Sequence, residues 1–316
     1  MHAPPSTDDG ILCCEVGRER FAFRSADVRH VERSEYLRPD NGDDGRLGTL
    51  RLGGQQVPVF GLGDVLGMTG DGRIHVREGH IAVTGDRQSL TGWYVDRIAR
   101  AARPAHGDVS PLPSIVGAKA TSWFEGIVWL GEDESALLLS PHGLVSPVPV
   151  DAHDDAPTFA QPRTAADSES VAVVFSTSVL PASDALRYAL SGRQIAAIVQ
   201  PTPPIAVPGC HDFVDGVMWW RRTAVPVLDF RARIDRHDTT HRRRLIVQCG
   251  TRQRGSLIAF SIEPGVFMCR PEADHRLLPE VRCPAFASGV FDVNGQPVAL
   301  LDLDALLGAE GAAACA

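Results

Sequence analysis

Two histidines spaced four residues apart are the nearest approach to a metal-binding motif in this chain. On a helix, His237 and His241 would share one face, where two imidazoles can ligate zinc. The surrounding positive charge opposes a bound cation, since six arginines crowd the stretch: Arg231, Arg233, Arg236, Arg242, Arg243 and Arg244. We therefore expect a solvated loop and no metal site. The arginine cluster is either the edge of that loop or a contact for an acidic partner surface.

The sequence also lacks the common catalytic signatures. It contains no Gly-x-Ser-x-Gly elbow, which would present a serine nucleophile. Gly61, Gly63 and Gly67 superficially resemble a dinucleotide loop, but the third glycine comes one residue too late. That stretch predicts a turn leading into a short helix. We expect no catalytic residue, no cofactor and no metal, and hence a protein that is not an enzyme.

The run Trp219-Trp220-Arg221-Arg222 is the strongest local indication of binding chemistry. Adjacent residues on a strand point to opposite faces, so one tryptophan can lie in the core while the other faces outward. An outward tryptophan beside an arginine is the kind of anchor that dominates binding interfaces. In the alternative interpretation, both rings are buried between strands.

The overall composition is that of an ordinary globular protein. The 316 residues are 44% hydrophobic and 22% charged, and this length suggests two domains. A net charge of −8 argues against nucleic acid as the partner. We find no run of roughly 20 apolar residues and no signal peptide, so we expect a cytoplasmic protein without direct membrane insertion. The seven cysteines are scattered and never spaced Cys-x-x-Cys, which favours buried, reduced thiols.

Short motifs recur in the same order in the two halves of the chain, which indicates an internal duplication. Val57-Pro58-Val59 returns 168 residues later as Val225-Pro226-Val227, and Gly126-Ile127-Val128 returns 163 residues later as Gly289-Val290-Phe291. Arg-Pro and Leu-Pro pairs recur between these two motifs, at Arg103, Leu112, Arg270 and Leu278. A Pro-, Ala- and acid-rich stretch separates the halves. We predict a tail over 1–10, a first copy over 11–148, a linker over 149–168, a second copy over 169–309 and a tail over 310–316.

The apolar residues follow mostly the period of two that is typical of strands. Alternating or short apolar runs occupy residues 20–24, 56–60, 80–83, 92–96, 244–248 and 256–260, with turn residues every 8–12 positions. Helical signals are few. One helical turn is predicted over 25–31, and a short helix over 302–307 that stops at Gly308. The fold prediction is all-β in both copies.

The duplicated pattern resembles the CheW-like domain, the adaptor module of bacterial chemosensory systems. In the second half, residues 216–230 look like the family signature G-x-x-N-L-R-G-x-V-x-P-V-x-D-L, with Arg221 on its Arg and Asp229 on its Asp. Trp219 replaces the Asn and Arg222 the Gly, whereas Val225-Pro226-Val227 keeps the apolar strand. The closing stretch 289–307 is similar to the family's last strand and helix.

The first half resembles the same family over about 11–146 but departs where the signature is sharpest. Gly53 stands where the family has Arg, and Gly61 stands where it has Asp. Conversely, when the two halves are aligned, Ala259 of the second half stands at the position of Asp96 in the first half. The strand pattern therefore survives in both copies, while the polar signature residues survive mainly in the second.

The resemblance implies two CheW-like domains, each a pair of SH3-like five-stranded β-barrels with a few short helices. It also implies a non-enzymatic adaptor that couples chemoreceptors to a CheA-type histidine kinase. The expected partners are the regulatory domain of the kinase, the cytoplasmic tip of a chemoreceptor and other CheW-like proteins, with recruitment to membrane-associated receptor arrays. Candidate partner-binding residues are Arg221, Asp229, Trp219, Trp220 and Arg222. The alternative is an assembly or localisation platform, a homo-oligomer at a pole or pilus, without kinase coupling.

Overall fold

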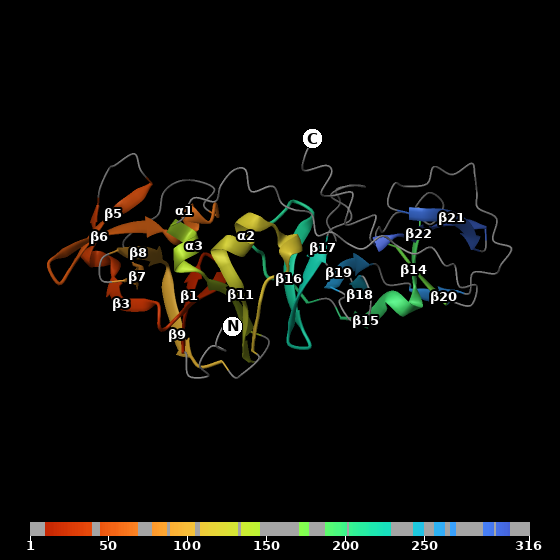
Figure 1. Cartoon of the computed structure of the whole chain (residues 1–316), viewed down its shortest axis with the longest axis horizontal. Helices are drawn as coiled ribbons and strands as arrows, with labels where there is room; N and C mark the ends of the chain where they lie inside the picture. The colour runs from red at the N-terminus through yellow and green to blue at the C-terminus, as the bar shows by residue number, and fades with distance from the viewer. Residues whose placement is uncertain are drawn as a thin grey trace, which may run out of the picture. The chain divides into compact units, whose positions relative to one another are not determined.

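The computed structural model of the chain is built from strands with only short helices (Figure 1). It describes residues 10–39, 45–68, 78–86, 89–104, 108–131, 134–145, 171–176, 187–200, 202–228, 243–249, 256–262, 266–269, 287–293 and 295–303. Their strands form four sheets. The linker predicted over 149–168 lies outside the described residues.

The chain divides into two compact units, and each unit is made of segments that are not contiguous in the sequence. The first unit contains Met1–Ala152 together with two later segments, Ile205–His211 and Trp219–Ala224. The second unit contains the remaining residues from His153 onward. The segment that carries the tryptophan pair and the two arginines therefore belongs to the first unit.

One sheet of the first copy joins the beginning of that copy to its end. Its central pair is parallel, with Phe21 opposite Leu137 and Ala22 opposite Leu138, while the other neighbouring strands are antiparallel. In sheet order the strands are β10 (Val109–Ser110), β11 (Phe124–Gly131), β12 (Glu134–Leu139), β2 (Glu19–Arg24), β1 (Ile11–Val16) and β9 (Arg97–Ala102).

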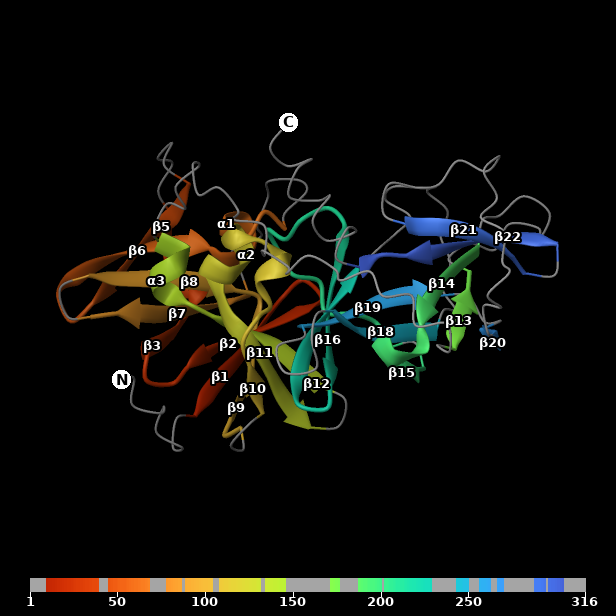
Figure 2. The ribbon, with the colours of Figure 1, turned by 45° about the vertical axis from the view of Figure 1, so that its right-hand side comes forward.

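The other sheet of the first copy is built from the residues between β2 and β9 (Figure 2). Its parallel pair places Val59 opposite Gly92. In sheet order the strands are β3 (Val28–Arg33), β7 (His80–Gly85), β8 (Leu90–Val95), β6 (Gln55–Gly61), β5 (Arg46–Leu52) and β4 (Arg38–Pro39). The two-residue strands β4 and β10 bring the sheets of this copy to six strands each, against the five expected.

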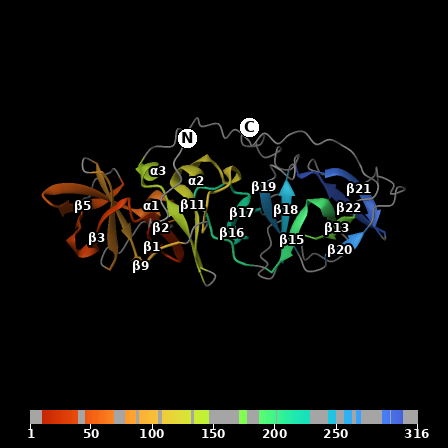
Figure 3. The ribbon, with the colours of Figure 1, turned by 60° about the horizontal axis from the view of Figure 1, so that its bottom comes forward.

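The second copy repeats this plan with two five-stranded sheets. The first sheet runs β20 (Phe267–Cys269), β13 (Ala172–Phe175), β14 (Arg187–Ser191), β22 (Gln296–Leu301), β21 (Ala287–Val293). The second runs β15 (Ile195–Val199), β18 (Arg243–Cys249), β19 (Ser256–Ile262), β17 (Thr223–Leu228), β16 (Val214–Trp220), and these strands lie side by side in Figure 3. Each sheet again contains one parallel pair, β14 with β22 and β17 with β19.

Strand register confirms the duplication and corrects one detail of the alignment. Val227, the counterpart of Val59, lies opposite Ala259, as Val59 lies opposite Gly92. Ala259 is therefore the counterpart of Gly92 and not of Asp96, so the alignment was wrong by four residues there. The error arose because both strands carry short apolar runs that can be matched in more than one register. The prediction of an all-β chain made of two copies is confirmed.

The helices in the described part of the chain are all shorter than eight residues. The turn-to-helix prediction for residues 61–67 is confirmed by α1 (Leu62–Val65), which directly follows β6. The others are α2 (Ala118–Trp123), α3 (Pro141–Val145) and the 3₁₀ turns η1 (Ser34–Tyr36), η2 (Ser114–Val116) and η3 (Gly192–Gln194). Figure 1 shows α2 and α3 next to each other beside β11. Most of the helix predicted over 302–307 lies outside the described residues.

The helical turn predicted over 25–31 is wrong. Residues 25–27 form a turn, and β3 begins at Val28 and pairs with β7. The exposed side chains of Arg29, Val31 and Arg33 alternate with half-buried ones, which is the period of a strand. The Ser/Asp start suggested a helix cap locally, but pairing with β7 decides the conformation.

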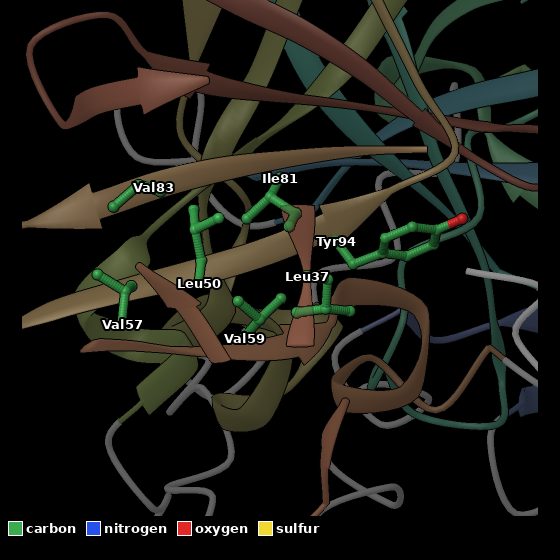
Figure 4. Packing of buried hydrophobic residues seen from close by; sticks show 7 residues of the cluster. All are labelled: Leu37, Leu50, Val57, Val59, Ile81, Val83 and Tyr94. Atoms are coloured by element: carbon green, nitrogen blue, oxygen red, sulfur yellow. The ribbon is translucent and has the colours of Figure 1, made fainter. Parts of the chain in front are cut away.

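Each copy buries its own apolar cluster. In the first copy, Leu50 of β5 and Val57 and Val59 of β6 meet Ile81 and Val83 of β7, with Leu37 and Tyr94 at one side (Figure 4). The second copy has a cluster of Ala172, Val174, Ala189, Phe291 and Val298 on its other sheet, β20-β13-β14-β22-β21. Since apolar burial contributes roughly 25 cal/mol per Å², each cluster supplies its own copy with a stabilising core.

Candidate functional site

The tip of the β16–β17 hairpin carries four of the five predicted binding residues. β16 ends at Trp220 and β17 begins at Thr223, so the connection is the two-residue turn Arg221-Arg222. Both residues have positive φ, 47° and 67°, as the central residues of a type I′ hairpin turn do. This left-handed conformation costs a residue with a side chain about 1–2 kcal/mol.

The same turn in the first copy is made of glycine. β5 ends at Leu52 and β6 begins at Gln55, and Gly53 and Gly54 have φ values of 55° and 88°. The two hairpins thus share one backbone geometry, but only the second places large cationic side chains on it. Because glycine adopts this conformation without strain, the arginines add strain that the fold itself does not require.

The two tryptophans of the hairpin have different neighbours, although both are half-buried. The ring of Trp219 stacks on the ring of Trp129 of β11, with the centroids 6.1 Å apart and the planes 10° from parallel. Trp220 lies under Arg221, whose Cζ is 4.6 Å from the ring centroid, in a cation–π arrangement. Neither sequence interpretation was complete, because Trp219 stacks on another half-buried ring and Trp220 supports an arginine.

Two polar contacts hold the other side of the hairpin tip. A guanidinium nitrogen of Arg222 lies 3.4 Å from a carboxylate oxygen of Asp108. The backbone N–H of Ala224 donates to the hydroxyl oxygen of Ser110 at 2.9 Å in a buried bond. Asp108, Ser110 and Trp129 are in or next to β10 and β11, so the tip is anchored on one small region of the first unit.

A neighbouring loop of the same unit packs on α2. Gly209, with a φ of 73°, approaches the Trp123 ring so closely that an added Cβ would lie 2.9 Å from it. The side chain of Lys119 also lies over the Trp123 ring, with Nζ 4.7 Å from the ring centroid. A glycine is therefore required at position 209.

Three sequence predictions near this hairpin fall on residues that the structure does not describe. Asp229, the predicted acidic member of the site, lies just beyond the end of β17 and outside the described residues. The histidine pair His237 and His241 also lies outside them, as does most of the arginine cluster. Asp229 therefore stays a prediction.

A second exposed surface was missed by the sequence analysis. On β3, an edge strand of its sheet, Arg29, Val31 and Arg33 all have exposed side chains, and Tyr36 of the following η1 turn is 59% exposed. Ile198 is the exposed counterpart on β15, also an edge strand. The signal was the alternation across residues 28–33, which was interpreted as a helical turn. Exposed strand edges with Tyr and Arg are suited to protein docking.

Charges on the opposite sheet of the first copy are mostly paired with one another. Glu15 accepts from Arg97 and also pairs with Arg20, which lies 2.9 Å from Glu134. Glu134 is in turn 3.2 Å from Arg100. This network crosses four neighbouring strands, β9, β1, β2 and β12. A charged partner gains less here than at the hairpin tip, because it would have to replace existing ion pairs.

The described residues show no arrangement suited to catalysis. No three His, Cys, Asp or Glu side chains among them gather closely enough to hold a metal ion. A polar cavity of about 380 Å³ lies between β3, the β7–β8 turn and α3, but its carboxylates are engaged: Glu125 pairs with Arg24, and Asp86 accepts from the backbone of Ser89. Burial raises the pKa values of the Cys13 and Cys14 thiols, so they stay protonated and unreactive near neutral pH.

Two cysteines in the described part of the chain confirm the prediction of buried, reduced thiols. Cys13 and Cys14 are buried thiols, whereas the thiols of Cys210 and Cys269 are half-buried. Among the described helices, none has the length and apolar character to cross a bilayer.

Fold and site together define a class: a duplicated two-sheet β module with an exposed cation–aromatic hairpin tip in one copy. The family model for the CheW-like domain matches residues 10–148 and 182–311, which is more than half of the chain. The chain belongs to the CheW-like domain family, as a tandem member with two copies of the domain.

One solved structure with similarity to this chain is the scaffolding protein TtCheW from Thermoanaerobacter tengcongensis. The two are 19% identical, the match covers 46% of this chain and 95% of that chain, and the TM-score is 0.38. No curated protein matches the chain.

Proposed function

We propose that this chain is a non-enzymatic adaptor in a bacterial chemosensory complex, coupling chemoreceptors to a CheA-type histidine kinase through protein–protein contacts. Membership of the CheW-like family supports this proposal. The observation that carries it is the hairpin tip, where Arg221 is presented over Trp220 on a strained turn that glycines form in the other copy. Strain that a fold does not need indicates a functional position. In this proposal the second copy carries the kinase contact.

The surface on β3 supports a second docking site in the first copy. Its exposed Val31 and Tyr36 and its flanking arginines have the composition of a protein interface. We assign this surface to the receptor tip or another CheW-like protein. A protein with two such surfaces can bridge two partners, which is what an adaptor at membrane-associated receptor arrays requires.

The test is a titration of the regulatory domain of the cognate CheA-type kinase with three forms of the full chain. The native protein should bind with a Kd below about 100 µM, within the range of transient signalling contacts. Arg221→Glu should weaken binding at least about tenfold, because it reverses the charge at the proposed contact. A glutamate at the equivalent position of the first copy, Gly53→Glu, should alter the Kd by less than about twofold.

Gly53→Glu is a demanding control, since it introduces backbone strain that Arg221→Glu does not. Circular dichroism of both variants therefore has to match the native spectrum before the affinities are compared. Equal weakening by the two variants would show that the second copy does not carry the contact.

The alternative function, a homo-oligomeric assembly or localisation platform, is favoured by the β3 edge alone. Light scattering after size-exclusion chromatography distinguishes it. A stable oligomer that binds neither kinase nor receptor would support the platform and contradict the adaptor.

A further inference from the structure

The hairpin tip proposed to bind the kinase is already partly occupied by contacts inside the protein. Trp219 stacks on Trp129, and Arg222 faces Asp108. All four residues belong to the first compact unit. Two of the four side chains that could form a docking surface at the tip are thus engaged with the β10–β11 region.

The remaining two side chains, Arg221 and Trp220, contact each other. Arg221 is exposed and rests on Trp220. A partner that contacts only Arg221 can bind the tip while the contacts of Trp219 and Arg222 remain intact. A partner that needs the whole tip must first separate Trp219 from Trp129, because the face of the Trp219 ring that stacks on Trp129 is not available to a new neighbour.

From this geometry we propose that the β10–β11 region acts as an intramolecular cap on the hairpin tip and lowers its affinity for the kinase regulatory domain. Trp129 is the main element of the cap, and Asp108 assists it by holding Arg222. This inference rests on the proposed function and adds a regulatory step to the same site. Opening of the cap exposes Trp219 and Arg222 beside Arg221, and the complete tip then binds more tightly.

The size of the effect follows from the population of the open form. When only a fraction of the protein is competent to bind, the apparent Kd is the intrinsic Kd divided by that fraction. A cap that is closed in about nine molecules of ten weakens binding about tenfold. Removing the Trp129 side chain should recover most of this tenfold loss of affinity. Loss of the Arg222–Asp108 pair should recover less, because the Arg222 side chain is 59% exposed and solvent screens its charge.

The experiment uses the full chain and the cognate kinase regulatory domain. Trp129→Ala should lower the Kd by about three- to tenfold, and Asp108→Asn by about two- to threefold. Ser135→Ala is the matched control, because Ser135 lies directly opposite Trp129 on the neighbouring strand without taking part in the stack. It should leave the Kd unchanged.

A spectroscopic measurement reports on the cap without any partner. Two stacked indoles give an exciton couplet in circular dichroism, and this signal should disappear equally in Trp129→Ala and Trp219→Ala. Asp108→Asn keeps both rings and tests the cap even if Trp129→Ala destabilises β11. A couplet in the native protein together with tighter binding by either cap variant supports the inference.

Two outcomes would overturn it in distinguishable ways. Native-level or weaker binding by both cap variants would show that the contact does not restrain the site, while the adaptor function would stand. Absence of binding by the native protein and by both variants would reject the adaptor function and the cap together. Binding by Trp129→Ala alone, with none by the native protein, would support a cap that is closed in nearly all molecules.

Discussion

At the scale of single residues, Tyr188 of β14 connects burial to stability. Its side chain is 5% exposed, and burial raises the pKa of the phenol to about 12. The unfolded chain has an ordinary phenol pKa near 10, so between these values the unfolded state loses a proton that the folded state retains. The stabilisation from protonated Tyr188 is therefore complete below about pH 10 and is lost as the pH rises toward 12.

We predict that Tyr188→Phe makes stability less sensitive to alkali. The native protein should lose about 2–3 kcal/mol of unfolding free energy from this group between about pH 10 and pH 12. Urea unfolding of both forms across that range measures the difference. Tyr36→Phe is the control, because Tyr36 is 59% exposed. The interpretation fails if Tyr188→Phe and the native protein lose stability in parallel.

At the scale of elements, the two hairpin turns offer a comparison within one molecule. Gly53-Gly54 and Arg221-Arg222 have the same left-handed backbone, but only the arginines already carry the strain of a side chain there. Nothing lies within 4 Å of a Cβ added at Gly54, so a substitution there changes the backbone energy alone.

Gly54→Ala should therefore lower the unfolding free energy by about 1 kcal/mol. Arg222→Ala should change it by less than about 0.5 kcal/mol, because the left-handed strain is already present and the Arg222 side chain of the lost ion pair is 59% exposed. Shifts of the urea midpoint at constant m-value give both numbers. Equal losses in the two variants would mean that strain at Arg222 is relieved in a way that the backbone geometry does not show.

Sequence patterns predicted these elements well where pairing is local and poorly where it is not. The hairpins around Gly53 and Arg221 could be predicted because the two strands and the turn of each lie within 16 residues. β3 was misread because its strand character depends on β7, which begins more than 45 residues later. Ala259 was assigned to the wrong counterpart because a short apolar run fixes no register without its partner strand.

The candidate site was predicted only in part, for a related reason. The Trp219–Arg222 segment was recognised from composition and family resemblance. Its neighbours Trp129, Asp108 and Ser110 come about 90 residues or more before it, and no local pattern connects them to it. The exposed β3 surface could not be predicted for the same reason, since local sequence does not show that β3 lies at the edge of its sheet.

At the scale of the whole molecule, two separate cores predict two separately testable stabilities. Leu50 is 2% exposed in the first-copy cluster, and Val298 is fully buried in the second-copy cluster. Leu50→Ala should cost about 2–5 kcal/mol, and Val298→Ala about 2 kcal/mol or more. Each variant should destabilise mainly the unit that contains it.

Hydrogen exchange with mass spectrometry resolves this by segment. Leu50→Ala should accelerate exchange in β5, β6, β7 and β8, and Val298→Ala in β13, β14, β21 and β22. In each variant, the strands expected to respond to the other substitution serve as the control. Acceleration of all strands by either substitution would show that the chain unfolds as one cooperative body.

The parallel pairing of β2 with β12 also has a consequence for the newly made chain. Phe21 finds its partner Leu137 only 116 positions later, and Ala189 in the second copy waits similarly for Leu300. At a translation rate of about 5–20 residues per second, β2 leaves the ribosome roughly 6–25 s before its neighbour exists. During that interval it has an open edge that other chains can pair with. The yield of folded protein should therefore depend on translation speed and on chaperones that cover β2 and β14 while they wait.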